Sequence, residues 1–214
     1  MREPMGRGLL LGVGALLLLD ALGARLGIVP DLALRLPGAS AWVLSRALGL
    51  TAYAALTLDV CLGLLVSGGT LDRWVARVRL LEAHRWLSGV SLALLAAHAL
   101  VLLLDGFAGF DALDVVVPFV APLRPLAVGL GILAGYALFV VRESFEWRPR
   151  IGVRVWRALH SASYVAFALA TAHGLLAGTD ASRSWALASY GLACAVVGAL
   201  TFVRFRGLLA RVAA

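Results

Sequence analysis

The sequence predicts an all-α integral membrane protein, a six-helix bundle with both termini on the cytoplasmic side. Hydrophobic residues make up 62% of the 214-residue chain and charged residues only 14%, and the mean hydropathy is +0.94. The apolar residues fall in six runs, and a bilayer-spanning helix needs about 20 such residues. We therefore expect residues 1–214 to form a single multi-pass domain in an inner or plasma membrane.

Six ranges are expected to be membrane-spanning helices. They are about 8–28, 39–67, 81–104, 122–142, 155–178 and 184–204. The first run opens with arginines as a secretory signal does, but five further spans follow it, which favours an uncleaved helix. The third and fifth runs each follow an arginine-rich inner connection, residues 71–80 and 142–157. The fourth follows the longest outer connection, residues 105–125, which we expect to lie on the membrane surface and shape access to the outer side.

The arginines predict the orientation of the bundle. With a cytoplasmic N-terminus, fourteen of the nineteen arginines lie at the inner side, and lysine is absent. Only Arg25, Arg35, Arg46, Arg124 and Arg183 lie at the outer side. This asymmetry satisfies the positive-inside rule. The high isoelectric point then reflects topology and anionic lipid, and it gives no reason to expect a nucleic-acid partner.

Tryptophans and cysteines agree with a membrane bundle. The six tryptophans, Trp156 among them, fall near expected helix ends, as in an interfacial aromatic belt. Cys61 and Cys194 lie in separate apolar runs, which does not indicate a disulfide. The chain has no C-x-x-C-H motif, so any heme would be held non-covalently.

The four histidines carry the strongest functional signal. His84 and His98 lie on the third run, His160 and His173 on the fifth, and there are no others. An imidazole inside a membrane is costly unless it is paired or ligated. Fourteen residues of helix rise about 21 Å and thirteen about 20 Å, so one metal cannot bridge the histidines of one helix. Side by side, the two helices would give two His–His pairs at two depths, which suits two stacked hemes.

The fifth run needs a local irregularity for this pairing. On an ideal helix, residues thirteen apart point about 140° away from each other. We therefore expect a π-bulge or local unwinding within residues 161–172, because such features often mark functional sites. Zinc is a weaker alternative, since no close i, i+4 pair or cysteine cluster is present. Histidines that only bond a neighbouring helix, or that carry protons in a heme-free transporter or scaffold, are further alternatives.

Four stretches resemble the ferric-reductase-like transmembrane domain. They are residues 42–68, 84–105, 124–144 and 155–180, with the two histidine spacings, and the likeness covers about residues 38–204. That family includes ferric reductases, NADPH oxidases and the heme-binding membrane subunit of the periplasmic methionine-sulfoxide reductase system. The resemblance implies b-type hemes at His84/His160 and at His98/His173. It also implies electron flow from the cytoplasmic to the outer side, and all four histidines favour the two-heme members.

The expected partners follow from the same resemblance. Ferric reductases and oxidases carry a flavin and nicotinamide module after the sixth helix. Gly129, Gly131 and Gly135 miss the dinucleotide spacing and lie within an apolar run. Helix packing through Gly131 and Gly135, or through Gly8 and Gly12, is the better interpretation. We therefore expect an oxidoreductase component whose electrons come from a cytoplasmic flavoprotein or a quinone. The acceptor would be ferric iron, oxygen or an extracytoplasmic redox protein.

Arginines and mid-membrane carboxylates complete the candidate site. Arg46 lies about 10 Å deep in the second run, where it could pair with a propionate of the outer heme. Arg85 and Arg157 flank the inner histidines and could hold inner propionates, although positive-inside anchoring explains them equally well. Asp20 and Asp59 are intramembrane carboxylates that are expected to be protonated or paired. Three alternatives stay open beside the two-heme conductor: a one-heme membrane subunit of a periplasmic reductase, a heme-free transporter or scaffold, and a heme-handling protein.

Overall fold

The computed structural model describes residues 40–105 and 109–212, and every described regular element is a helix. The elements are α2 (Ser40–Gly68), α3 (Arg77–Leu102), α4 (Ala112–Val116), α5 (Pro125–Ser161), α6 (Ser163–Ala177) and α7 (Ser184–Val212). Four segments are long and apolar enough to cross a membrane: Ala41–Gly68, Arg77–Leu102, Pro125–Ala177 and Ser184–Gly207. The described part of the chain is thus an all-helical membrane protein, and the expected first helix at about 8–28 lies outside it.

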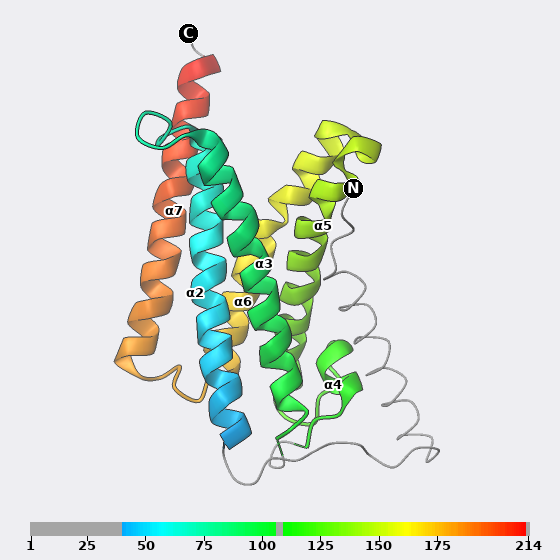
Figure 1. Ribbon diagram of the computed structural model, residues 1–214. Coiled ribbons are helices and arrows are strands. Elements are labelled where there is room, and N and C mark those ends of the chain that lie inside the picture. The colour runs from blue at the N-terminus through cyan, green and yellow to red at the C-terminus, as the bar shows by residue number, and fades with distance from the viewer. Residues whose placement is uncertain (1–39, 106–108, 213–214) are drawn as a thin grey trace.

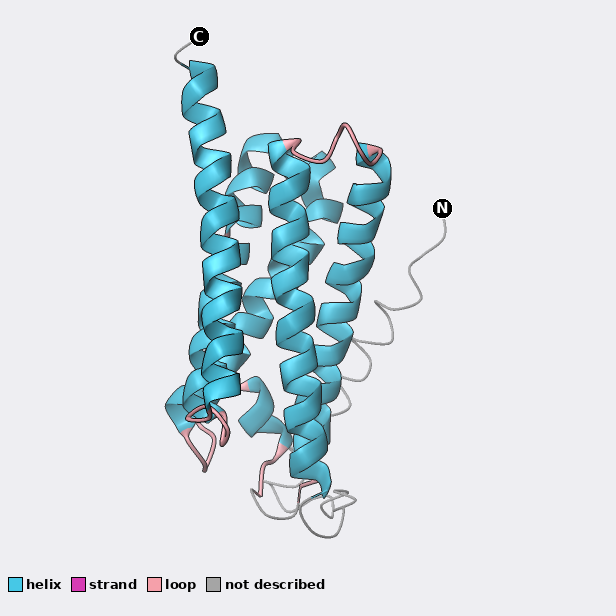
Figure 2. Cartoon of the chain, turned by 90° about the vertical axis from the view of Figure 1, so that its left-hand side faces the viewer, coloured by secondary structure: helices cyan, strands magenta, loops and turns pink. Residues whose placement is uncertain are grey.

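The long helices run side by side, with their connections gathered at the two ends (Figures 1 and 2). The apolar runs form helices because lipid offers no hydrogen bonds, so each segment must satisfy its own backbone. Gly69, at a φ of 68°, follows the last residue of α2, where a left-handed glycine commonly ends a helix. Pro125 is the first residue of α5, where the lack of an N–H costs no hydrogen bond within the helix.

The span Pro125–Ala177 turns back on itself at a single residue. Gly152 has φ 78° and ψ 164°, and the helix resumes directly after it. The leg before this turn and the leg after it lie beside each other in Figure 1. The expected inner connection at residues 142–157 is therefore wrong in detail, because all of it except Gly152 is helical. The turn and the connection between α2 and α3 lie at the same end of the bundle (Figure 1), as the arginine distribution predicts.

The leg after the turn contains an irregularity within residues 161–172, but not the π-bulge or unwinding that was expected there. Helix α5 ends at Ser161 and α6 begins at Ser163, with Ala162 between them. The Ala162 N–H bonds to the carbonyl of Leu159, three residues back, at 3.1 Å. This is a tightened turn rather than a π-bulge, and tightening adds rotation per residue. The rotation between His160 and His173 is then closer to four full turns, so the two side chains lie closer to one face of the leg.

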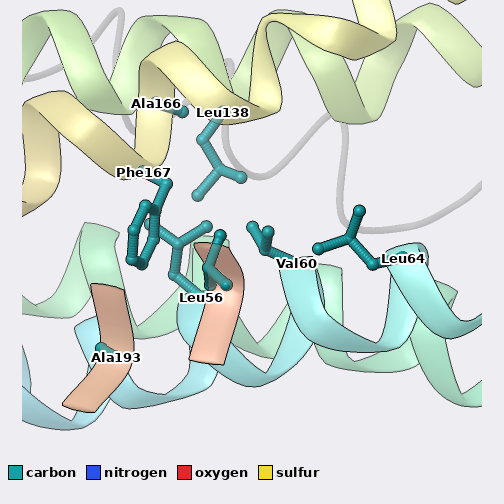
Figure 3. Close-up of a cluster of buried hydrophobic side chains, with 8 residues drawn as sticks. Leu56, Val60, Leu64, Leu138, Ala166, Phe167 and Ala193 are labelled. Carbon is teal, nitrogen blue, oxygen red and sulfur yellow. The ribbon is translucent and has the colours of Figure 1, made fainter. Parts of the chain in front are cut away.

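An apolar cluster packs four helices of the bundle together. It joins α2, α5, α6 and α7 through buried side chains that face the same space in Figure 3. They are Leu56, Val60, Leu64, Leu138, Ala166, Phe167, Ala193 and Val197. Since lipid is as apolar as these side chains, their close packing rather than the hydrophobic effect holds the helices together.

Gly152→Ala is expected to destabilise the fold through its backbone alone. A Cβ at Gly152 would meet nothing within 4 Å, but its φ and ψ belong to a region that only glycine occupies readily, at a cost of about 1–3 kcal/mol otherwise. The apparent melting temperature in detergent should fall by roughly 2–10 °C. Gly191→Ala is the matched control, because that helical glycine also has open space and an ordinary φ. Equal melting temperatures for the two variants would contradict this account of the turn.

Candidate functional site: two histidine pairs

The structure brings the four histidines together in the two expected pairs. His84 on α3 faces His160 near the end of α5, with ring centroids 6.1 Å apart and planes at 83°. His98 on α3 faces His173 on α6, again at 6.1 Å, with planes at 74°. We call His84 and His160 the inner pair, and His98 and His173 the outer pair. Fourteen residues of α3 separate the two levels by about 21 Å.

The histidine side chains meet where their backbones stay apart. Among the described residues, α3 and α6 make no close backbone contact, whereas α2 packs along α3 and α5 packs along α6. The outer pair therefore reaches across a space between α3 and α6. A cavity of about 450 Å³ occupies this level and is lined by His98 and His173. That volume lies within the range of small-molecule and cofactor sites.

Backbone carbonyls orient both outer imidazoles. His98 Nδ1 lies 2.7 Å from the Ser45 carbonyl oxygen and 3.0 Å from the Ser45 hydroxyl. His173 Nδ1 lies 2.7 Å from the carbonyl oxygen of Ala127. A carbonyl can only accept, so each Nδ1 carries the proton and each Nε2 keeps its lone pair. This is the arrangement found around metal-binding histidines, where the second nitrogen fixes the tautomer.

Glycines create room for three of the rings. A Cβ at Gly49 would lie 3.0 Å from His98 Nδ1, and one at Gly63 would lie 3.2 Å from His84 Cε1. A Cβ at Gly131 would lie 2.6 Å from His173 Nδ1. Gly131 was expected to serve helix packing, and the structure shows that the side chain it admits is a histidine. Gly49 and Gly63 were missed, although their spacing equals that of His84 and His98.

The inner pair has a different environment. His84 Nδ1 lies 2.8 Å from Asp59 Oδ1 on α2, although the angle falls outside hydrogen-bond geometry. His160 Nδ1 is buried without a hydrogen-bond partner among the described residues. The Trp156 ring stacks on His160 at 5.2 Å and 29°. Trp156 was assigned to the interfacial belt, and its place one helical turn before His160 is the signal that could have identified it.

The arginines predicted for the site lie in varied surroundings. Arg46 pairs with Asp180, which also contacts Arg183 at 3.2 Å. Arg46 lines the outer cavity, so it lies at the predicted level but already has a carboxylate partner. Arg85 is exposed and stacks over Phe145 at 4.9 Å. Arg157 is exposed on the leg that carries His160.

The expected outer connection contributes to the outer cavity. Asp111 caps α4 by accepting from the backbone N–H groups of Leu113 and Asp114, at 2.8 and 3.1 Å. Phe110 and Val115 from this segment line the same cavity as the outer pair. The described part of the segment therefore forms part of the cavity wall, and its role in access stays a prediction.

Two facing imidazole pairs are the chemistry that this bundle offers. Comparisons of the chain with protein-family models, curated proteins and solved structures found no match. Within residues 40–105 and 109–212, no three His, Cys, Asp or Glu side chains gather as a metal cluster. Among the described residues each pair offers two imidazoles, fewer than the three or four side chains that usually hold a zinc ion. An iron inside a macrocycle needs only two axial ligands, which each pair can supply.

The Arg46–Asp180 pair should be stabilising only while both charges are present. Arg46→Gln leaves Asp180 partly buried with Arg183 as its remaining partner, so the apparent melting temperature should fall. Adding Asp180→Asn should restore part of that loss, corresponding to a coupling of about 0.5–3 kcal/mol. The measurement is a double-mutant cycle of thermal unfolding in detergent. Additive effects of the two substitutions would show that the pair contributes no coupling energy.

Proposed function

We propose that the protein conducts electrons across the membrane through two stacked b-type hemes. His84 and His160 would be the axial ligands of one heme, and His98 and His173 those of the other. The observation that carries the proposal is the repeated geometry: two imidazole pairs at two levels, each with ring centroids 6.1 Å apart. When bound, heme supplies an iron that accepts and releases one electron.

The ring separation fits an iron between the imidazoles. A metal–imidazole bond is about 2.0–2.1 Å long, as known for zinc. Two such bonds, plus the distance from the nitrogen to the ring centroid on each side, give roughly 6.3 Å between the two centroids. Packed aromatic rings also lie at about 4.5–7 Å, so distance alone does not decide. The Nδ1 contacts of His98 and His173 support the proposed ligation, because they leave both Nε2 lone pairs directed away from the carbonyls.

The chain's own residues would orient the ligands and exclude water. Ser45 and Ala127 hold the outer imidazoles through their carbonyls, and Gly49 and Gly131 let those rings lie close to the helix backbones. The central cluster of Leu56, Leu138 and Phe167 keeps the interior between the levels apolar. Two axial ligands saturate an iron, which favours outer-sphere transfer over direct binding of a substrate.

The proposed membrane arrangement has six helices, with the first at about 8–28 and both termini cytoplasmic. The inner pair then lies towards the cytoplasm, and the outer pair towards the opposite side. Electrons would enter from a cytoplasmic flavoprotein, whose flavin stays on that partner, or from a quinone. They would leave to ferric iron, oxygen or an extracytoplasmic redox protein.

A one-heme membrane subunit is the second candidate. The outer pair lines the cavity of about 450 Å³, whereas neither inner histidine lines that cavity or the second described one, of about 210 Å³. The outer level thus has room for a cofactor in the present arrangement.

Replacing one histidine of each pair should remove one heme at a time. Purified wild-type protein is expected to bind two hemes per chain, with a low-spin b-type spectrum. His84→Ala and His98→Ala should each bind one, and the double variant none. The measurement is heme per chain by extraction, with reduced-minus-oxidised spectra. One heme in the wild type, lost only with His98→Ala, would favour the one-heme subunit, and none under heme-replete expression would overturn the proposal.

Gly131→Ala should disturb the outer heme selectively. The added methyl would lie 2.6 Å from His173 Nδ1, so the imidazole must shift away from the Ala127 carbonyl. We expect heme content to fall towards one per chain, or the outer spectrum to become partly high-spin. Gly135→Ala is the control one turn along α5, where the methyl would meet only the end of Leu95 at 3.2 Å. Indistinguishable spectra for both variants would contradict the assigned role of Gly131.

A further inference from the structure

The two histidine pairs differ in the charge that faces their Nδ1 atoms. In the outer pair, both Nδ1 atoms contact neutral carbonyl oxygens at 2.7 Å. In the inner pair, His84 Nδ1 contacts the carboxylate of Asp59 at 2.8 Å. Asp59 is only 5% exposed and lies on α2 beside Val60, within the apolar interior. A carboxylate in such surroundings is expensive to bury and persists in a membrane helix when it has a function.

A carboxylate at Nδ1 changes what the imidazole does at Nε2. It attracts the Nδ1 proton and increases the electron density of the ring, which makes the histidine a stronger donor to a metal. Stronger donation and a nearby negative charge both favour the oxidised iron. A neutral carbonyl has the same effect only weakly. The low dielectric of the interior increases the difference, because the charge is poorly screened there.

Arg204 on α7 opposes this effect and is the weaker influence. Its guanidinium also acts electrostatically on His160. It is partly exposed, whereas Asp59 is buried and in direct contact with a ligand candidate. Solvent and lipid headgroups screen an exposed charge much more than a buried one. Asp59 is therefore the acidic side chain in direct contact with the inner pair, and Arg204 is the more distant and more exposed group.

We propose that Asp59 is a positioning residue that acts through its contact with His84 and lowers the redox potential of the inner heme below that of the outer heme. This inference rests on the two-heme function proposed above. Electron transfer from the inner to the outer level is then downhill. The direction of electron flow would then be set by the protein itself, because a carboxylate contacts the inner pair and neutral carbonyls contact the outer pair.

Asp59→Asn tests this role with a nearly isosteric change. Spectroscopic redox titration of the purified full-length protein should show the potential of one heme rising while the other stays unchanged. Asp59→Glu keeps the carboxylate and should restore a low inner potential. Ser45→Ala is the matched control at the outer level, because it removes the hydroxyl beside His98 and leaves the inner pair untouched. Two bound hemes with unchanged potentials in Asp59→Asn would overturn the inference.

Single-heme variants keep the test decisive if Asp59→Asn fails to fold or loses its inner heme. His98→Ala should retain only the inner heme and His84→Ala only the outer one. The inner heme is expected to have the lower potential of the two. The reverse order, or equal potentials, would overturn the role of Asp59 while leaving two-heme conduction intact. A wild-type protein without heme would instead overturn the proposed function itself.

Discussion

The register between α2 and α3 is the constraint on which both histidine pairs depend. Gly49 lies against His98 and Gly63 against His84, so two glycines on one helix match two histidines on its antiparallel neighbour. A slip of one residue would put a side chain where an imidazole now lies. The contacts of Ser45 with His98 and of Asp59 with His84 belong to the same register. Helix α2 therefore sets the orientation of both α3 histidines, although it supplies no imidazole itself.

The other half of each pair depends on the leg that follows Gly152. His160 lies before the tightened turn at Ala162 and His173 after it, so the rotation of this leg determines whether both rings face α3. Trp156 stacks on His160 and contacts Phe145 across the Gly152 turn, with ring centroids 6.4 Å apart. The direction of the returning leg and the place of the inner imidazole are thus linked through one aromatic contact.

Patterns in the sequence were sufficient for the all-helical membrane class and for the pairing of the histidines. They also placed the described helices, although α5 continues past the expected end at 142 and α7 ends at Val212 rather than at about 204. Hydropathy and helical rise depend only on local sequence, so these expectations did not require knowledge of how the helices pack. The turn at Gly152 was placed in a long connection because arginines at 142–157 suggested a loop, whereas arginines extend readily from a helix at a membrane surface.

The partner of Arg46 could not be deduced, because Asp180 is distant in the chain and only packing brings it near. Asp59 was recognised as a mid-membrane carboxylate that would be protonated or paired, but its contact with His84 required the register of α2 on α3.

The depth of the two pairs has a consequence for the energy of conduction. Their levels lie about 21 Å apart along α3, in a hydrocarbon core of about 30 Å. An electron passing between them in the proposed conductor would cross roughly two thirds of the membrane's electric field. Each charge crossing the full field gains or loses about 2.3 kcal/mol per 100 mV, so this step alone would exchange about 1.6 kcal/mol per 100 mV. Conduction through this bundle would then be electrogenic, and the membrane voltage would act on it as directly as the identity of the donor and acceptor.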